Sequence, residues 1–127
     1  MDKQTAIQLI GFIERFDKER PLYELQIEPL TMTPYRYNEA ISDFIGFYYS
    51  NNLVLADCYD IKDDLEKNYE KKSDWFDTLT EKQVVQSIAF LIRQDRFING
   101  LVNSMIENGT IIKLLNRLKV LHDLYIR

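Results

Sequence analysis

The sequence predicts an all-α protein: a single compact domain of about six helices, with an irregular or short extended segment around residues 21–36. Apolar residues recur at helical spacings of three and four along most of the chain, and all three prolines lie inside that one segment. The length of 127 residues, with 46% apolar and 28% charged residues, suits one globular domain with its own core. We therefore expect residues 1–127 to fold as a single helical domain.

The first expected helix begins near the N-terminus. Asp2 is placed to cap it, because a short acidic side chain can accept a hydrogen bond from the free N–H groups of a first turn. An apolar stripe at spacings of three and four then follows, at Ala6, Leu9, Ile10, Ile13 and Phe16.

The proline-rich segment interrupts the helical pattern. Pro21, Pro29 and Pro34 cannot lie inside a helix, so we expect extended chain or short turns over the core, with two short strands as an alternative. The apolar residues of this segment are Leu22, Leu25, Ile27 and Leu30.

Two helices of different character are expected in the middle of the chain. Asn38 can cap the first, which ends near residues 51–52 and has the apolar stripe Ile41, Phe44, Ile45 and Tyr48. Asp60 is placed to cap the second, a surface helix with a narrow apolar face of Ile61, Leu65 and Tyr69.

The last third is expected to hold the central helices. Thr80 and Gln83 fit a capping box, and the helical pattern after them continues past Arg96 through Phe97. Asn108-Gly109 is a helix stop, after which Thr110 can cap a final helix. The inward stripe of that helix includes Ile111, Leu114, Leu115, Leu118, Leu121, His122 and Tyr125.

The net charge of −4 conceals a division of charge along the chain. Residues 21–81 contain five basic and thirteen acidic side chains, a net −8, whereas residues 82–127 contain seven basic and three acidic ones, a net +4. We interpret this as mutual complementation of two packed parts. The alternative is that the basic third faces an anionic partner, although the overall charge makes nucleic-acid binding unfavourable.

The residue inventory excludes most familiar chemistries. With a single His and a single Cys, the usual zinc ligand sets and an intramolecular disulfide cannot form, so we expect no metal and no cofactor. His122 is interpreted as a partly buried structural histidine and Cys58 as an inert thiol. The acidic residues Asp57, Asp60, Asp63 and Asp64 match no calcium loop. No phosphate-binding or nucleophile motif occurs.

The N-terminus lacks the pattern of a signal peptide, and no apolar stretch is long enough to span a bilayer. We therefore expect a cytoplasmic protein that does not enter a membrane.

The most informative cluster is Arg93-Gln94-Asp95-Arg96-Phe97-Ile98-Asn99-Gly100. Gly100 lies in the middle of a helical pattern, so we expect a close helix approach or a ligand contact that needs its small size. Arg93 and Arg96 either form an internal ion pair with a carboxylate such as Asp95 or bind an anion, together with Arg117 and Lys113.

Three blocks in this region resemble the C-terminal signature of a microbial family of unknown function, number 6508. They are Arg93-x-Asp-Arg-Phe-x-x-Gly100, Met105-x-Glu-x-Gly109 and Leu114-Leu-x-Arg-Leu-Lys119. The resemblance implies a compact helical domain and carries no known activity, so no catalytic residue follows from it. The matching positions are Arg93, Asp95, Arg96, Phe97, Gly100, Glu107, Gly109 and Arg117.

The leading functional hypothesis is a non-catalytic interaction or regulatory module that binds a protein partner or a second copy of itself. It rests on the absence of catalytic motifs and on an acidic segment rich in tyrosine, a residue common at interfaces. The interface candidates are Tyr35, Tyr37, Tyr48, Tyr49 and Tyr59. The alternatives are a small-ligand protein or enzyme with an anion site at Arg93 and Arg96, and weak nucleic-acid binding through the basic third.

Overall fold

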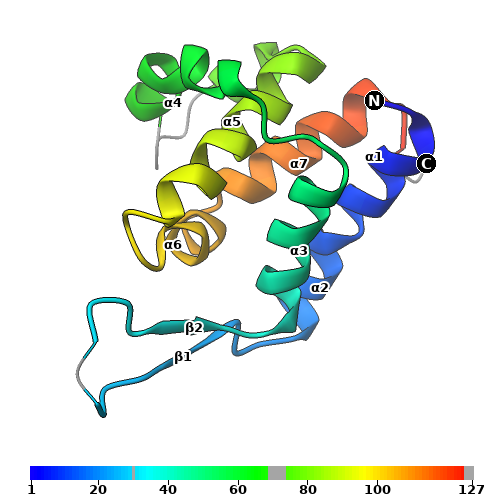
Figure 1. Cartoon of the computed structure of the whole chain (residues 1–127). Coiled ribbons are helices and arrows are strands. Elements are labelled where there is room, and N and C mark those ends of the chain that lie inside the picture. The colour runs from blue at the N-terminus through cyan, green and yellow to red at the C-terminus, as the bar shows by residue number, and fades with distance from the viewer. Residues whose placement is uncertain (30, 69–73, 125–127) are drawn as a thin grey trace.

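The structure is a computed structural model that describes residues 1–29, 31–68 and 74–124. It is mostly helical, with one two-stranded sheet (Figure 1). The elements are α1 (Lys3–Ile10), α2 (Phe12–Lys18), β1 (Tyr23–Leu25), β2 (Tyr35–Tyr37), α3 (Glu39–Ser50), η1 (Ala56–Ile61), α4 (Lys62–Asn68), η2 (Asp74–Thr78), α5 (Glu81–Asp95), α6 (Leu101–Glu107) and α7 (Thr110–Leu121), where η denotes a 3-10 helix. The predicted fold class is confirmed, including the extended segment around residues 21–36.

Helix α5 is the centre of the packing. It contacts η1, α6 and α7, while α1 packs on α7 and α2 packs on α3. Eight of its fifteen residues are buried, because neighbours surround it on several sides. The core includes Leu9, Phe44, Ile88, Leu91 and Leu114, all fully buried. Within the described ranges, no helix has the length and apolar content needed to cross a bilayer.

Two of the predicted helix caps are confirmed. The Asp2 carboxylate accepts from the Thr5 N–H at 2.7 Å. Thr80 and Gln83 form the reciprocal capping box, with bonds of 2.9 and 3.2 Å. Both signals consist of residues three apart in sequence, so their geometry does not depend on the rest of the fold.

Other boundaries were predicted wrongly. Asp60 does not cap a helix, because it lies inside η1 and α4 begins at Lys62. Thr110 is the first residue of α7, and Gly109, at φ +88°, is its N-cap. Asn38 is the N-cap residue of α3, as predicted, but its side chain accepts no hydrogen bond from the helix, and its amide donates to the Pro21 carbonyl. Leu30, Tyr69 and Tyr125 lie outside the described residues.

The continuous helix expected through Phe97 is also wrong. Helix α5 ends at Asp95, residues 96–100 form a turn, and α6 begins at Leu101. Gly100 is the N-cap of α6 and has φ +87°, a left-handed conformation that a residue with a side chain adopts only at a cost. The apolar spacing that suggested a helix across this turn is therefore accidental.

Strands β1 and β2 pair antiparallel as a hairpin that extends away from the helices (Figure 1). Tyr23 lies opposite Tyr37, and Leu25 lies opposite Tyr35. At its base, the hairpin meets the turn between α5 and α6. We call this base the hairpin root and residues 25–34 the hairpin tip.

Candidate functional site

The hairpin root is held by the carboxylate of Asp95, at the end of α5. Asp95 Oδ1 accepts from the Tyr37 hydroxyl at 2.5 Å and from the Val102 N–H at 2.9 Å. Val102 lies in the first turn of α6, where backbone N–H groups have no partner inside the helix. One carboxylate therefore ends α5, caps α6 and fixes β2.

Gly100 provides the second contact of the root. A Cβ atom at this position would lie 2.8 Å from the ring of Tyr35, well inside van der Waals contact. The neighbouring Asn99 accepts from the Tyr35 N–H through Oδ1 at 2.7 Å. The Tyr35 ring also packs against the Tyr23 ring at a tilt of 41°, with the ring centroids 4.9 Å apart. The close approach expected at Gly100 is thus made by an aromatic ring of the hairpin rather than by a helix.

The electrostatics of the root favour a neutral phenol. Burial raises the pKa of Tyr37 well above its usual range, and the hydrogen bond to Asp95 raises it further, since the phenolate would face a carboxylate. Tyr37 is therefore a proton donor to Asp95 throughout the ordinary pH range.

Arg96 and Phe97 are exposed and, unlike Asp95 and Gly100, form none of the contacts described for the root. Phe97 is 78% exposed and Ile98 is 54% exposed. Arg96 is exposed, and no hydrogen bond or ion pair of its side chain occurs within the described residues. Packing explains why an aspartate and a glycine occur at positions 95 and 100, whereas it does not explain why an arginine and a phenylalanine occur at positions 96 and 97.

The hairpin tip is the second exposed apolar region at this end of the molecule. Leu25, Ile27 and Met32 are 54%, 69% and 97% exposed. A shallow hollow of about 550 Å³ follows β1 and is lined by Glu24, Leu25, Gln26, Ile27, Glu28 and Arg36. We call the exposed side chains of the tip and the adjoining turn the hairpin-end surface; they are Leu25, Ile27, Met32, Phe97 and Ile98.

Arg93 lies one helical turn before Arg96 but has a packing role. Its guanidinium lies 5.3 Å from the ring centroid of Tyr59, a cation–π contact, and the ring in turn packs edge-on against Phe90. It also lies beside the buried thiol of Cys58, whose pKa is raised by burial despite the opposing effect of Arg93. Arg93 therefore attaches η1 to α5.

The other two anion candidates lie at the opposite end of α5. Arg117 Nε donates to the carbonyl of Leu79, just before α5, at 2.9 Å, and Lys113 lies over the ring of Phe76, 5.3 Å from its centroid. The fifteen residues of α5 span about 22 Å. One small anion therefore cannot contact all four cations.

The five tyrosines proposed for an interface are divided among different environments. Tyr48 is fully buried and belongs to the core, so it cannot contribute to a surface. Tyr35 and Tyr37 hold the hairpin root, and Tyr59 packs against Phe90 and Arg93 while remaining 38% exposed. Tyr49, at the end of α3, is 44% exposed.

The remaining residues singled out by the sequence have structural partners. Glu107 lies 3.8 Å from Arg20 in an exposed ion pair. His122 contacts Glu81, which also accepts from the N-terminal ammonium at 2.8 Å. Burial would raise the pKa of Glu81, but these two partners outweigh it and lower the pKa. Within the described residues, no three potential metal ligands gather.

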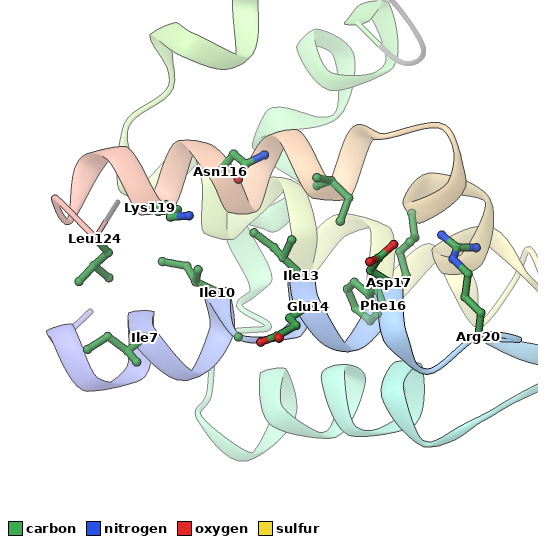
Figure 2. Close-up of a pocket in the computed structure, with 13 residues that line it drawn as sticks. Ile7, Ile10, Ile13, Glu14, Phe16, Asp17, Arg20, Asn116, Lys119 and Leu124 are labelled. Atoms are coloured by element: carbon green, nitrogen blue, oxygen red, sulfur yellow. The ribbon is translucent and has the colours of Figure 1, made fainter. Parts of the chain in front are cut away.

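A larger groove, about 610 Å³, lies on another side of the molecule, between α1–α2 and α7 (Figure 2). Figure 2 shows Ile7, Ile10 and Ile13 on one wall and Asn116, Lys119 and Leu124 on the other. Its charged lining has both signs: Glu14, Asp17, Arg20 and Lys119. The groove therefore favours neither an anionic nor a cationic ligand.

The sequence analysis missed the hairpin tip as a candidate surface. A signal was present, because Tyr23, Leu25 and Ile27 alternate with Glu24, Gln26 and Glu28, the period-two pattern of a strand. The pattern did not reveal that the apolar side chains are exposed, since the same alternation occurs in strands that bury their apolar face.

A family model described as a family of unknown function (DUF6508) matches residues 1–123, so the chain belongs to that family. The resemblance of the C-terminal blocks is thereby confirmed. No curated protein and no solved structure matches the chain.

Proposed function

For this member of the DUF6508 family, we propose a non-catalytic role as a protein-interaction module, with the hairpin-end surface as its binding site. The observation that supports it most is the exposure of five large apolar side chains at one end of the molecule: Leu25, Ile27, Met32, Phe97 and Ile98. Exposed apolar patches mark interaction sites on soluble proteins. Here three of the side chains come from one hairpin, and the other two are consecutive in the turn that holds Tyr35 of that hairpin.

The chemistry of the surface suits a protein partner. Aromatic residues, Met and Arg are enriched at interfaces, and Phe97, Met32 and Arg96 are exposed together at this end. Because the root is fixed by Asp95 and Gly100, the surface is presented in one orientation, which lowers the entropy lost on binding.

The proposal differs from the acidic Tyr-rich face inferred from sequence, since Tyr48 is buried and Tyr37 is engaged with Asp95. It keeps the inferred class of function. The alternative of an anion site at Arg93 and Arg96 loses support because the Arg93 guanidinium packs over the Tyr59 ring. Arg117 and Lys113 lie at the other end of α5, too far away to contribute.

The test is crosslinking capture in cells of the source organism with three forms of the protein. The double variant Ile27→Ser/Phe97→Ser should lose a captured protein at least tenfold. The matched control Ile7→Ser, which changes an exposed isoleucine in the groove, should retain it. Equal capture by all three forms would reject the proposal.

A further inference from the structure

The two strands of the hairpin differ in whether the backbone groups on their outer edges have hydrogen-bond partners. The Gln26 N–H donates to the Pro34 carbonyl at 2.7 Å, so the even-numbered residues of β1 hydrogen-bond to β2. In an antiparallel pair, hydrogen-bonded and non-hydrogen-bonded pairs alternate along the ladder. Tyr23 and Leu25 therefore direct their N–H and C=O groups away from β2, along the outer edge of β1.

The outer edge of β2 is covered by the α5–α6 turn. There the Tyr35 N–H donates to Asn99 Oδ1 at 2.7 Å. On the outer edge of β1, by contrast, the N–H groups of Tyr23 and Leu25 have no hydrogen-bond partner in residues 1–29, 31–68 and 74–124. Open edges of this kind can pair with an added strand.

We propose that β1 is a docking edge on which a basic, extended segment of a partner protein adds as a third strand. This inference rests on the proposed function and specifies how the partner engages the hairpin-end surface. Main-chain hydrogen bonds to Tyr23 and Leu25 would provide affinity, and the side chains on the two faces would provide specificity.

Charge selects a basic partner. Glu24 lies on β1 and Glu28 follows it three residues after the strand ends, and residues 21–35 contain no Lys or Arg. Arg36, opposite Glu24 on β2, is the basic residue of the two strands. A Lys or Arg placed beside Glu24 on an added strand makes a favourable cross-strand pair.

The same charges argue against a second copy of this chain as the occupant. Two antiparallel β1 edges would bring the Glu24 carboxylates of both copies onto one face of the joined sheet. Like charges across neighbouring strands are destabilising. A partner of opposite charge has no such penalty.

The other face of β1 supplies the apolar half of the recognition pattern. Leu25 is exposed there, and Ile27 is exposed two residues after the strand ends. Both residues line the hollow of about 550 Å³, together with charged residues such as Glu24 and Arg36. Pro21 and Pro29 bound the edge, so an added strand pairs within residues 22–28. The partner segment is thus short, with basic and apolar residues in alternation.

The deciding variant is Leu25→Pro. Because the Leu25 N–H points away from β2, proline removes a donor of the outer edge while leaving the hydrogen bonds of the hairpin intact. Leu25→Ala is the matched control, since it keeps the N–H and removes the apolar side chain. Circular dichroism and thermal unfolding establish that both variants are folded.

The probe is a synthetic alternating lysine–valine hexapeptide, titrated to millimolar concentration and followed by NMR amide shifts. We expect saturable shifts at residues 22–28. Leu25→Ala, which loses an apolar side chain of the recognition pattern, should raise Kd several-fold, and Leu25→Pro should raise it at least tenfold beyond Leu25→Ala. Glu24→Gln/Glu28→Gln should raise Kd several-fold. The glutamate–valine hexapeptide should not bind.

Several results would overturn the inference. They are equal binding by Leu25→Pro and Leu25→Ala, equal binding of the acidic peptide, or a dimer in light scattering that Leu25→Pro dissociates. If the basic peptide does not bind while Ile27→Ser/Phe97→Ser still abolishes capture of a partner, the docking edge is rejected and the proposed function stands. If both experiments fail, both proposals are rejected.

Discussion

The root and the tip belong to the same hairpin yet have opposite surroundings. At the root, the Tyr37 hydroxyl bonds to Asp95 and the Tyr35 ring covers Gly100. At the tip, Ile27 and Met32 are largely in solvent. The cluster at the end of α5 is divided in the same way. Asp95 and Gly100 hold the hairpin, whereas Arg96 and Phe97 are exposed and have no evident packing role.

The largest effect on stability should come from adding a side chain at Gly100, beneath the Tyr35 ring. Gly100→Ala places a Cβ 2.8 Å from the ring and forces a side chain into φ +87°. Strain and overpacking together should lower the free energy of unfolding by about 2–5 kcal/mol, measured by urea denaturation.

Two other glycines serve as controls for this prediction. Gly109 has a similar positive φ but open space around it. Gly109→Ala should therefore lower the free energy of unfolding only by the backbone strain, about 1–2 kcal/mol. Gly46 lies within α3 with open space around it, so Gly46→Ala should raise the free energy of unfolding by about 0.5–1 kcal/mol. A Gly100→Ala variant no less stable than Gly109→Ala would contradict the contact with Tyr35.

The next effect concerns the carboxylate that joins three elements. Asp95→Ala leaves the Val102 N–H and the Tyr37 hydroxyl without their acceptor, at a cost of about 1–3 kcal/mol. Asp95→Asn keeps an oxygen acceptor, so it should lower the free energy of unfolding by less than Asp95→Ala does. The amides of residues 35–37 should exchange faster in Asp95→Ala, and unchanged protection would show that Asp95 does not hold the hairpin.

A smaller effect is expected at alkaline pH. The folded-state pKa of Tyr37 is raised above the unfolded value of 10.0, so the folded state retains a proton that the unfolded state releases. The stability linked to Tyr37 is therefore fully present below pH 10 and is lost as the pH rises further. Buried Tyr48 acts in the same direction. Tyr37→Phe should reduce this alkaline loss, as measured by denaturation across pH 8–11, and an unchanged slope would contradict the buried bond to Asp95.

The smallest effect on stability should be at the tip. Ile27→Ser removes an exposed side chain, so the free energy of unfolding should change by no more than about 0.5 kcal/mol. The same substitution, combined with Phe97→Ser, should weaken partner capture. A loss of stability above 1 kcal/mol would mean that the tip is packed rather than free.

Sequence reasoning succeeded where neighbouring residues set the structure. Asp2 with Thr5, and Thr80 with Gln83, form local caps that depend on spacing alone. It failed where a distant segment decides. Gly100 was recognised as needing its small size, but the ring that requires it comes from Tyr35, far away in sequence.

The same limit explains the errors about exposure. Phe97 fits a helical apolar pattern and Tyr48 fits an interface composition, yet one is in solvent and the other in the core. Periodicity reports local conformation, and the neighbours that cover a side chain are set by tertiary packing. The importance of the cluster at the end of α5 was predictable. The predicted ion pair was not found in the described part of the chain, because Asp95 accepts from Tyr37 and Val102 and Arg93 lies over the Tyr59 ring.

Amide hydrogen exchange across the hairpin, measured by NMR, tests the central contrast most directly. The Tyr35 amide, bonded to Asn99, should be protected in the free protein, whereas the amides of Tyr23 and Leu25 should exchange freely. Binding of the lysine–valine hexapeptide should then protect Tyr23 and Leu25 and leave Tyr35 unchanged. Protection of Tyr23 and Leu25 in the free protein, or free exchange of Tyr35, would contradict an anchored β2 and an open β1.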